Sequence, residues 1–514
     1  INFTSDKCPV VIAAIFISGI GGTFQYGYCI SVMTSPSTFI MDLINKTCEH
    51  RYRFTLEKWH VSLIWSFTVS IFCIGGLLGS LMAGSFISKF GRKRCLFLNN
   101  FVAIFGAVLM ILSQTALSFE MIMVGRFLYG INSGVSLSAH TMYLTECAPK
   151  RLRGMVGVTI ATFISLGKFS GQLLGISELL GTEKAWPWLL GFNGFTALFQ
   201  LLTLPFLPES PSFLLILNLC IVLKKLWGNK DYSGEVAEML EERAALQSVH
   251  SHSVLELIQT QAVRWQLLTI IVTFTTLQLS GINAVYFYSF EVFRAAGIQE
   301  HKIRYAALGT GLCELFTSFL IIESMGKKVL LFRGYMGMTG TLILLTISVY
   351  LQRQVSWMPY CSMVLTFIFI FFFASGPAGV TAPLPGEIFT QSFKSAAYTI
   401  ACTINWTGLF VLGMVFPLLV ENLDSFCFLI FTLFCFGCAM YVKFNVPETK
   451  NRTVLEIKAE FKKMHRKPGA SEEKRSTDHK ETTGNYLNAI VYNYNIYTFQ
   501  LCQHTHDCIG GWFQ

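Results

Sequence analysis

Apolar residues run along the chain in twelve long stretches, separated by short polar connectors. The stretches fall at residues 10–33, 61–87, 95–116, 121–146, 155–178, 187–207, 265–293, 303–323, 329–351, 358–383, 396–421 and 424–444. A helix needs about 20 predominantly apolar residues to cross a bilayer, and each stretch reaches about that length. The pattern therefore predicts an all-α membrane protein with twelve transmembrane helices, and the even number places both termini on one side.

The basic residues indicate which side that is. The short connectors divide Lys and Arg almost evenly, but the polar segment 209–264 and the basic tail after residue 446 fall on one side. Cytoplasmic segments carry the excess of Lys and Arg, so we expect both termini in the cytoplasm of a multi-pass plasma-membrane protein. Asn45-Lys46-Thr47 then lies outside, where this triplet type accepts an N-glycan on Asn45.

Two short motifs recur at a nearly constant spacing. Gly91-Arg92-Lys93 follows the second stretch and Gly326-Lys327-Lys328 follows the eighth, while Glu146 ends the fourth and Glu387 ends the tenth. The spacings of 235 residues (91 to 326) and 241 residues (146 to 387) indicate that six helices were duplicated in parallel orientation. This arrangement is similar to that of major facilitator transporters, which bind substrate between the two halves near the middle of the membrane.

The repeat predicts the domain organisation. We expect a six-helix bundle over 1–208, a cytoplasmic linker loop over 209–264, a second six-helix bundle over 265–446, and a cytoplasmic tail over 447–514 whose last 30 or so residues are atypical.

Composition excludes a soluble enzyme. The chain has 53% hydrophobic and only 13% charged residues, whereas soluble domains are about 25% charged. The net charge of +9 comes from connectors and tail, so we expect the lipid bilayer as a partner and no nucleic acid. No phosphate-binding glycine loop occurs and no cofactor is implied. A His504-X-His506-X-Cys508 run without a second cluster does not make a metal site.

Carboxylates and cations gather near the predicted cytoplasmic ends of the helices. Ion pairs among them can hold the two halves closed when the site faces outward and break when it faces inward. The alternative is that these cations only set topology and reach the lipid headgroups. The candidate gating residues are Arg92, Lys93, Glu146, Arg153, Glu209, Glu323, Lys327, Glu387 and Lys394.

Few ionisable residues lie inside the stretches, where each is costly enough to suggest a function. Glu314 lies in a helix expected to border the substrate cavity, so a substrate or proton role competes with a buried structural hydrogen bond. Arg126 fits an architectural role. Lys168 and His140 either line the cavity or face water near a helix end, and the sequence assigns neither a role.

The seventh stretch is interrupted by the polar run Gln278-Leu279-Ser280-Gly281-Ile282-Asn283, followed by Tyr286 and Tyr288. Amides offer both donors and acceptors, and with aromatic rings they suit a neutral polyhydroxylated ring better than an ion. The tenth stretch carries Gly376-Pro377, which predicts a second broken helix or a packing kink.

These motifs together resemble the sugar porter family, and within it the facilitative hexose transporters. The resemblance covers residues 10 to 462. Its motifs are Gly125-Arg126, Tyr143-Leu144-Thr145-Glu146, Leu152-Arg153-Gly154, Pro208-Glu209-Ser210-Pro211, Gln278 to Asn283, Asn405-Trp406 and Pro447-Glu448-Thr449-Lys450. Gln25-Tyr26-Gly27-Tyr28 and Ala382 resemble the class II branch, which includes fructose and urate carriers.

The resemblance implies a substrate site formed by Tyr26, Gln278, Asn283, Glu314 and Asn405. Three positions depart from the family pattern, because Leu277 and Ala161 replace glutamines and Glu314 replaces an asparagine. These departures leave fructose, glucose and urate as candidate substrates.

The resemblance also bears on mechanism. Proton-coupled relatives carry an Asp in the first span where this chain has Cys29, so we expect facilitated diffusion of a hexose by alternating access. Two alternatives stay open: a urate transporter of the same branch, and a sugar sensor that binds without transporting. The oligomeric state is not determined by the sequence.

Overall fold

A computed structural model describes residues 9–465, except for 149–152, 212, 214–225, 227–251, 321–325, 353, 424–425, 451 and 453. The chain forms two compact units, residues 1–461 and 462–514. All the helices described here begin in the first unit, and only α22 (Val454–Met464) continues past its boundary.

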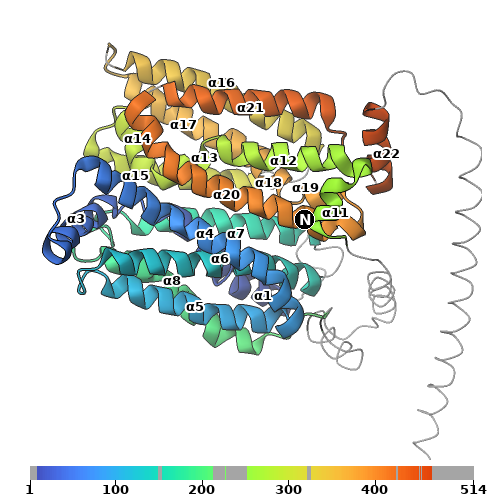
Figure 1. Ribbon diagram of the computed structural model, residues 1–514, viewed down its shortest axis with the longest axis horizontal. Helices are drawn as coiled ribbons and strands as arrows, with labels where there is room; N and C mark the ends of the chain where they lie inside the picture. The colour runs from blue at the N-terminus through green and yellow to red at the C-terminus, as the bar shows by residue number, and fades with distance from the viewer. Residues whose placement is uncertain are drawn as a thin grey trace, which may run out of the picture. The chain divides into compact units, whose positions relative to one another are not determined.

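Each of the twelve predicted stretches forms one helix or a broken helix (Figure 1). In chain order these are α1 (Pro9–Ile20) with α2 (Thr23–Ser31), α4 (Lys58–Phe90), α5 (Arg92–Leu112), α6 (Phe119–Cys147), α7 (Arg153–Leu174), α8 (Trp186–Thr203), α12 (Arg264–Leu279) with α13 (Ile282–Phe287) and α14 (Ser289–Ala295), α15 (Glu300–Leu320), α16 (Lys327–Leu351), α17 (Met358–Ser375) with α18 (Pro377–Thr381), α20 (Gln391–Leu423) and α21 (Cys427–Asn445). Shorter helices lie between them: α3 (Ser37–Thr47), α11 (Val254–Gln259) and α19 (Leu384–Ile388).

Nine of these segments, among the residues that the structure describes, are long and apolar enough by themselves to cross a membrane. The other three predicted spans are α6, α7 and α15, which form helices but carry more polar residues. Arg126, His140, Lys168 and Glu314 lie on them and are all buried. These helices face other helices on several sides, so these residues are buried inside the protein rather than exposed to lipid. The twelve-helix prediction is confirmed.

Three spans are broken where the sequence carries glycine or proline. α1 gives way to α2 at Gly21-Gly22, and α17 gives way to α18 at Gly376-Pro377. Between α12 and α13, Gly281 has a φ of +84°, a left-handed conformation that glycine adopts without steric cost. The break predicted in the seventh stretch therefore lies at Gly281.

Glycine also sets how closely the helices pack. A Cβ on Gly75, Gly79 or Gly130 would collide with backbone of the facing helix, because α4 and α6 pack backbone to backbone. Small residues at helix crossings are the usual means of association in a bilayer, where no hydrophobic effect drives helices together.

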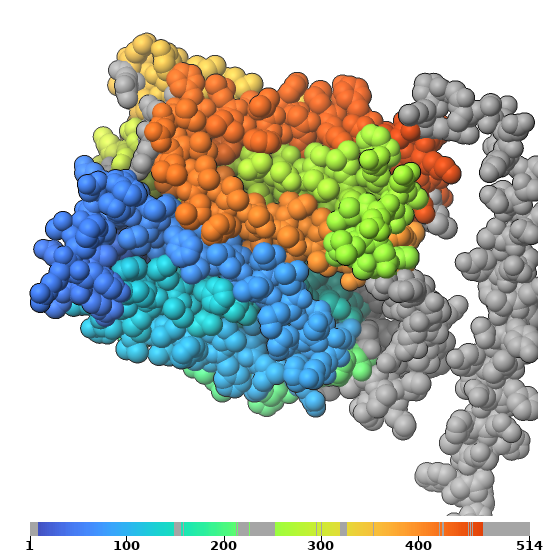
Figure 2. Space-filling model, in the orientation of Figure 1, coloured from blue at the N-terminus to red at the C-terminus, as the bar shows by residue number. Residues whose placement is uncertain are grey.

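The first six spans meet the last six along two helix pairs. α4 lies against α20, and α7 lies against α15; Figure 2 shows α4 in blue directly beside α20 in orange. At the first pair, the Trp406 ring covers Gly76 and its Nε1 donates to Ser80 Oγ at 2.9 Å. These contacts make the two halves a single compact unit.

Candidate functional site

Three amides form a hydrogen-bonded ladder beside the break in the seventh span. Gln278 Nε2 donates to Asn405 Oδ1 at 2.6 Å, and Asn283 Nδ2 donates to Gln278 Oε1 at 2.7 Å. Among the described residues, no hydrogen bond uses the Asn405 amide nitrogen or the Asn283 amide oxygen. The ladder thus keeps a donor at one end and an acceptor at the other, as recognition of hydroxyl groups requires.

Aromatic rings lie next to the ladder. The Tyr26 ring meets the Trp406 ring edge to face, with centroids 5.8 Å apart, and stacks near Phe72 at 6.4 Å. Trp406 follows Asn405 directly on α20. The structure thereby connects Tyr26 of the first half to the amides of the second half.

A buried ion pair joins the two halves nearby. Lys168 Nζ lies 2.9 and 3.0 Å from the two carboxylate oxygens of Glu314. The Tyr286 hydroxyl also donates to this carboxylate. Because Tyr286 follows Asn283 by three residues on α13, Glu314 is linked to the amide ladder through one short helix.

The five residues predicted to bind substrate therefore fall into two connected groups. Gln278, Asn283 and Asn405 bond to one another, and Tyr26 joins them through Trp406. Glu314 belongs to the ion pair with Lys168. Their role in binding stays a prediction, since no ligand is present.

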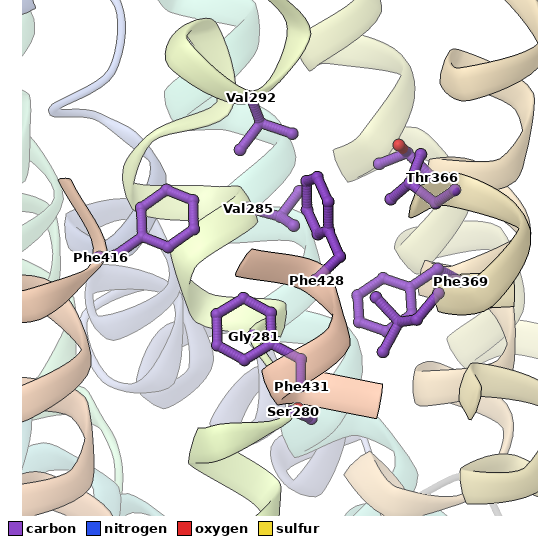
Figure 3. A pocket seen from close by; sticks show the side chains of 11 residues that line it. Ser280, Gly281, Val285, Val292, Thr366, Phe369, Phe416, Phe428 and Phe431 are labelled. Atoms are coloured by element: carbon purple, nitrogen blue, oxygen red, sulfur yellow. The ribbon is translucent and has the colours of Figure 1, made fainter. Parts of the chain in front are cut away.

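An apolar pocket lies at the helix break (Figure 3). It is lined by Ser280, Gly281, Val285, Val292, Leu342, Leu345, Thr366, Phe369, Phe416, Phe428 and Phe431. Only Ser280 and Thr366 offer side-chain hydroxyls there, so this pocket lacks the polar groups that a sugar needs. It is distinct from the amide ladder.

The first half carries a compact salt-bridge network at the end of the molecule where α4 ends and α5 begins. Arg92 Nη2 lies 2.9 Å from Glu146 Oε1, and Ser210 Oγ donates to the same carboxylate. Glu209 Oε1 accepts the backbone N–H of Lys93 at 2.8 Å, which satisfies a free donor at the start of α5. We call this end of the molecule the ion-pair end.

The second half carries a corresponding network, in which one lysine both pairs with the carboxylate and supplies the capped backbone N–H. Lys327 pairs with Glu387, and Thr449 Oγ1 donates to Glu387 Oε2 at 2.9 Å. Glu448 Oε1 accepts the backbone N–H of Lys327 at 2.8 Å, at the start of α16. Each set of ion pairs lies within its own half and does not cross to the other. Their role as gates between the halves therefore stays a prediction.

The remaining predicted residues are placed as follows. Lys394 makes no ion pair within the described part of the chain, and its ammonium lies near Gly386. Glu323 and the side chain of Arg153 lie outside the described residues, as does the atypical end of the tail. Asn45 is exposed near the end of α3, at the end of the molecule opposite the ion pairs.

Arg126 has the architectural role expected of it. It is buried, and its guanidinium donates to the carbonyl oxygens of Cys29 at 2.7 Å and Val69 at 2.9 Å while lying over the Phe72 ring. It therefore ties α2 and α4 to α6 inside the first half.

Sequence reasoning missed two features. It gave Lys168 no role, although the spacing of Ala161, Ser165 and Lys168 places them on one face of a helix. Ala161 is one of the positions where this chain departs from the substrate-site residues of the family. It also missed Glu448 as the counterpart of Glu209. The signal was present, since Pro208-Glu209-Ser210 and Pro447-Glu448-Thr449 are 239 residues apart (209 to 448).

Twelve spans in two halves, with a polar site at their junction, define a membrane carrier of the major facilitator type. The family model described as "Sugar (and other) transporter" matches residues 14–461. The chain belongs to this family, and it is a multi-pass membrane transporter rather than an enzyme.

Curated relatives match over nearly their whole lengths. Human solute carrier family 2, facilitated glucose transporter member 9, is 42% identical over 90% of this chain and 86% of its own. Bovine member 5 is 40% identical over 91% of this chain and 95% of its own. Human member 11 is 41% identical over 89% of this chain and 94% of its own.

Solved structures share the fold. The proton:xylose symporter XylE bound to 6-bromo-6-deoxy-D-glucose has a TM-score of 0.70 at 20% identity, covering 88% of this chain and 99% of that one. The inward-open conformation of XylE from E. coli has a TM-score of 0.71 at 19% identity, covering 87% of this chain and 99% of that one.

Proposed function

We propose that this protein carries a hexose across the plasma membrane by facilitated diffusion, with fructose slightly preferred over glucose. The amide ladder of Gln278, Asn283 and Asn405 is the observation that carries the proposal. Its free donor and acceptor, beside the rings of Tyr26 and Trp406, match the alternating hydroxyls and apolar face of a sugar. The relatives named as facilitated glucose transporters support the same substrate class.

The mechanism is alternating access without an energy source. One group of described hydrogen bonds between the halves runs from Thr34 Oγ1 to the Tyr286 carbonyl, from Gln172 to Thr310, from Arg304 to the Gly181 carbonyl and from Tyr305 to Glu178. Others join Lys168 to Glu314, Ser165 to Ser318 and Trp406 to Ser80. The first group lies toward the end opposite the ion pairs, which is therefore held together by more of these bonds. A molecule closed at that end releases its substrate at the ion-pair end, which we assign to the cytoplasm together with both termini.

The two salt-bridge networks would then serve the opposite state. When the site faces outward, the ion-pair ends of the two halves approach each other, and Arg92, Glu146, Lys327 and Glu387 come to lie near their junction. Gating by these residues, with Lys93, Arg153, Glu209, Glu323 and Lys394, completes the proposed cycle.

Uptake into proteoliposomes tests the transport proposal. The full chain should take up radiolabelled fructose or glucose with saturation and without a proton gradient. Gln278→Leu, which breaks the ladder at its centre, should lower uptake about tenfold or more, because a sugar hydroxyl would lose its partner. Gln261→Leu, a change at an exposed glutamine, is the matched control and should transport normally.

The same assay decides between the alternatives. Saturable uptake of urate without hexose uptake would make the protein a urate carrier. Binding of hexose without any uptake would make it a sensor, and absence of both would contradict the assignment of the site.

Orientation has its own test. If Asn45 faces the outside and carries a glycan, glycosidase treatment of protein from mammalian cells should increase its gel mobility, and Asn45→Gln should have that mobility without treatment. A glycan that persists in Asn45→Gln, or none in the wild type, would remove Asn45 as the acceptor.

A further inference from the structure

The ion pair of Lys168 and Glu314 has an unusual position. It lies in the membrane-spanning part of the molecule, and the two side chains are only 6% and 5% exposed. Lys168 belongs to α7 of the first half and Glu314 to α15 of the second. The pair therefore forms across the surface along which the two halves must move.

The carboxylate of Glu314 is fully engaged. It accepts from Lys168 on both oxygens and from the Tyr286 hydroxyl on one of them. Ser165 Oγ lies 3.4 Å from Oε1. The Lys168 ammonium in turn lies 4.2 Å from the centre of the Tyr286 ring. Lys168, Glu314 and Tyr286 therefore each contact the other two.

No other described cation faces Glu314. Tyr286 from α13, Tyr26 from α2 and Cys313 from α15 itself are close enough to interact with its charge. Tyrosine and cysteine side chains are ordinarily uncharged at neutral pH. The charge of Glu314 is thus balanced by Lys168 alone within the described part of the chain.

This charge balance is important because an unpaired charge is energetically unfavourable when it is buried within the membrane-spanning part of a protein. Removing one partner of a buried pair leaves an uncompensated ion and is strongly destabilising. A carboxylate left without Lys168 would keep water at the junction of α7 and α15, or would have to take up a proton before the halves closed. Either result opposes closure around a neutral solute.

We propose that Lys168 is a specificity-determining residue of the transport site: by cancelling the charge of Glu314, it lets the halves close around an uncharged polyhydroxylated substrate without a proton. This inference rests on the proposed hexose transport. It assigns a role to a residue beside the amide ladder rather than to the ladder itself. Loss of Lys168 should make uptake depend on protons.

The test is hexose uptake into proteoliposomes at equal pH on both sides, between pH 5.5 and 7.5. Wild type should give a flat profile. Lys168→Gln should transport about tenfold less at pH 7.5 than at pH 5.5, because closing the halves on an unpaired buried carboxylate is costly whereas closing them on a neutral carboxyl group is not. The double variant Lys168→Gln/Glu314→Gln has no charge to balance and should again be flat, whatever its rate.

Two further variants separate charge from packing. Lys168→Arg keeps the cation and should stay flat across the range. Lys184→Gln, at an exposed lysine, is the control for the loss of one positive charge and should also stay flat. A flat profile for Lys168→Gln, or a pH dependence that persists in the double variant, would overturn the proposal.

Thermal unfolding of the purified full chain tests charge balance without transport. In Lys168→Gln, a carboxylate that binds a proton in the folded state makes stability greatest at low pH, so the unfolding temperature should fall from pH 5.5 to 7.5 relative to wild type. The double variant should show no such fall. If wild type carries no hexose, the proposed function fails, and this measurement alone decides the role of Lys168; equal profiles for all variants would reject it.

Discussion

Single residues fix the geometry of the substrate region, and Gly281 is the clearest example. Its positive φ and the Phe431 ring, 2.5 Å from where a Cβ would stand, leave no room for a side chain. Gly281→Ala should therefore lower stability by about 1–2 kcal/mol from the backbone conformation alone, and more from the collision. Thermal unfolding measures the loss.

A matched glycine gives the control for this change. Gly437 lies in α21, and no atom comes within 4 Å of the place that a Cβ would take there, so Gly437→Ala should unfold at the same or a slightly higher temperature. Equal effects of the two substitutions would contradict the assigned role of Gly281.

Glu120 is a residue whose contribution depends on pH. Burial opposes its ionisation, but hydrogen bonds from Ser118 and Tyr52 and the charge of Arg51 outweigh burial and hold its pKa below the usual 4.5. A carboxylate whose pKa is lower in the folded than in the unfolded protein stabilises the fold at any pH above the unfolded pKa. That stabilisation is lost as the pH falls through the folded pKa.

The expected result is small because Glu120 is about a third exposed. Glu120→Gln should destabilise the protein at pH 7 by less than about 1 kcal/mol, and the difference should shrink as the pH falls below 4.5 and through the lowered pKa of the folded protein. A gap between the two proteins that stays constant on acidification, measured by unfolding in detergent, would argue against the hydrogen-bonded carboxylate.

At the scale of elements, a glutamate side chain caps the N-terminus of one helix in each half. Glu209 caps α5 and Glu448 caps α16 by accepting backbone N–H groups through one carboxylate oxygen. Glu209→Ala and Glu448→Ala should each lower stability by about 1 kcal/mol, the typical value of a lost N-terminal cap. The sites share no partner, so the double variant should cost the sum.

Glu49→Ala, an exposed glutamate in the same protein, serves as the control for these caps and should change stability little. A double variant no less stable than either single variant would show that the two caps are not independent.

The elements were largely predictable, and the reason is physical. Twelve apolar stretches became helices because backbone polar groups in lipid must be satisfied within each segment. The sequence also located the break at Gly281. It did not reveal that Lys168 reaches Glu314, because their pairing depends on how α7 faces α15, 146 residues apart in the chain, and helix periodicity carries no information on facing partners. The capping role of Glu448, by contrast, had a signal in the sequence, because Pro447-Glu448 repeats Pro208-Glu209 at nearly the spacing of the other repeated motifs.

At the scale of the whole molecule, transport requires the two halves to close on each other. Gly76 lies under the Trp406 ring at the α4–α20 junction. Gly76→Leu should hold the halves apart and lower hexose uptake about tenfold or more at equal surface expression. The reason is that a close-packed helix contact has no room for the added side chain.

Gly84→Leu is the control, because nothing lies within 4 Å of a Cβ there. It should leave uptake unchanged. Normal uptake by Gly76→Leu would mean that the α4–α20 contact is not remade in each cycle.

The pairing of Lys168 with Glu314 also bears on bioenergetics. A cation and an anion that stay together carry no net charge through the membrane field, and a sugar carries none, so the potential does no work on the carrier. Uptake should be the same in polarised and depolarised cells, and the solute would come to equal concentrations on both sides. Such a protein equalises supply between compartments and cannot accumulate its cargo.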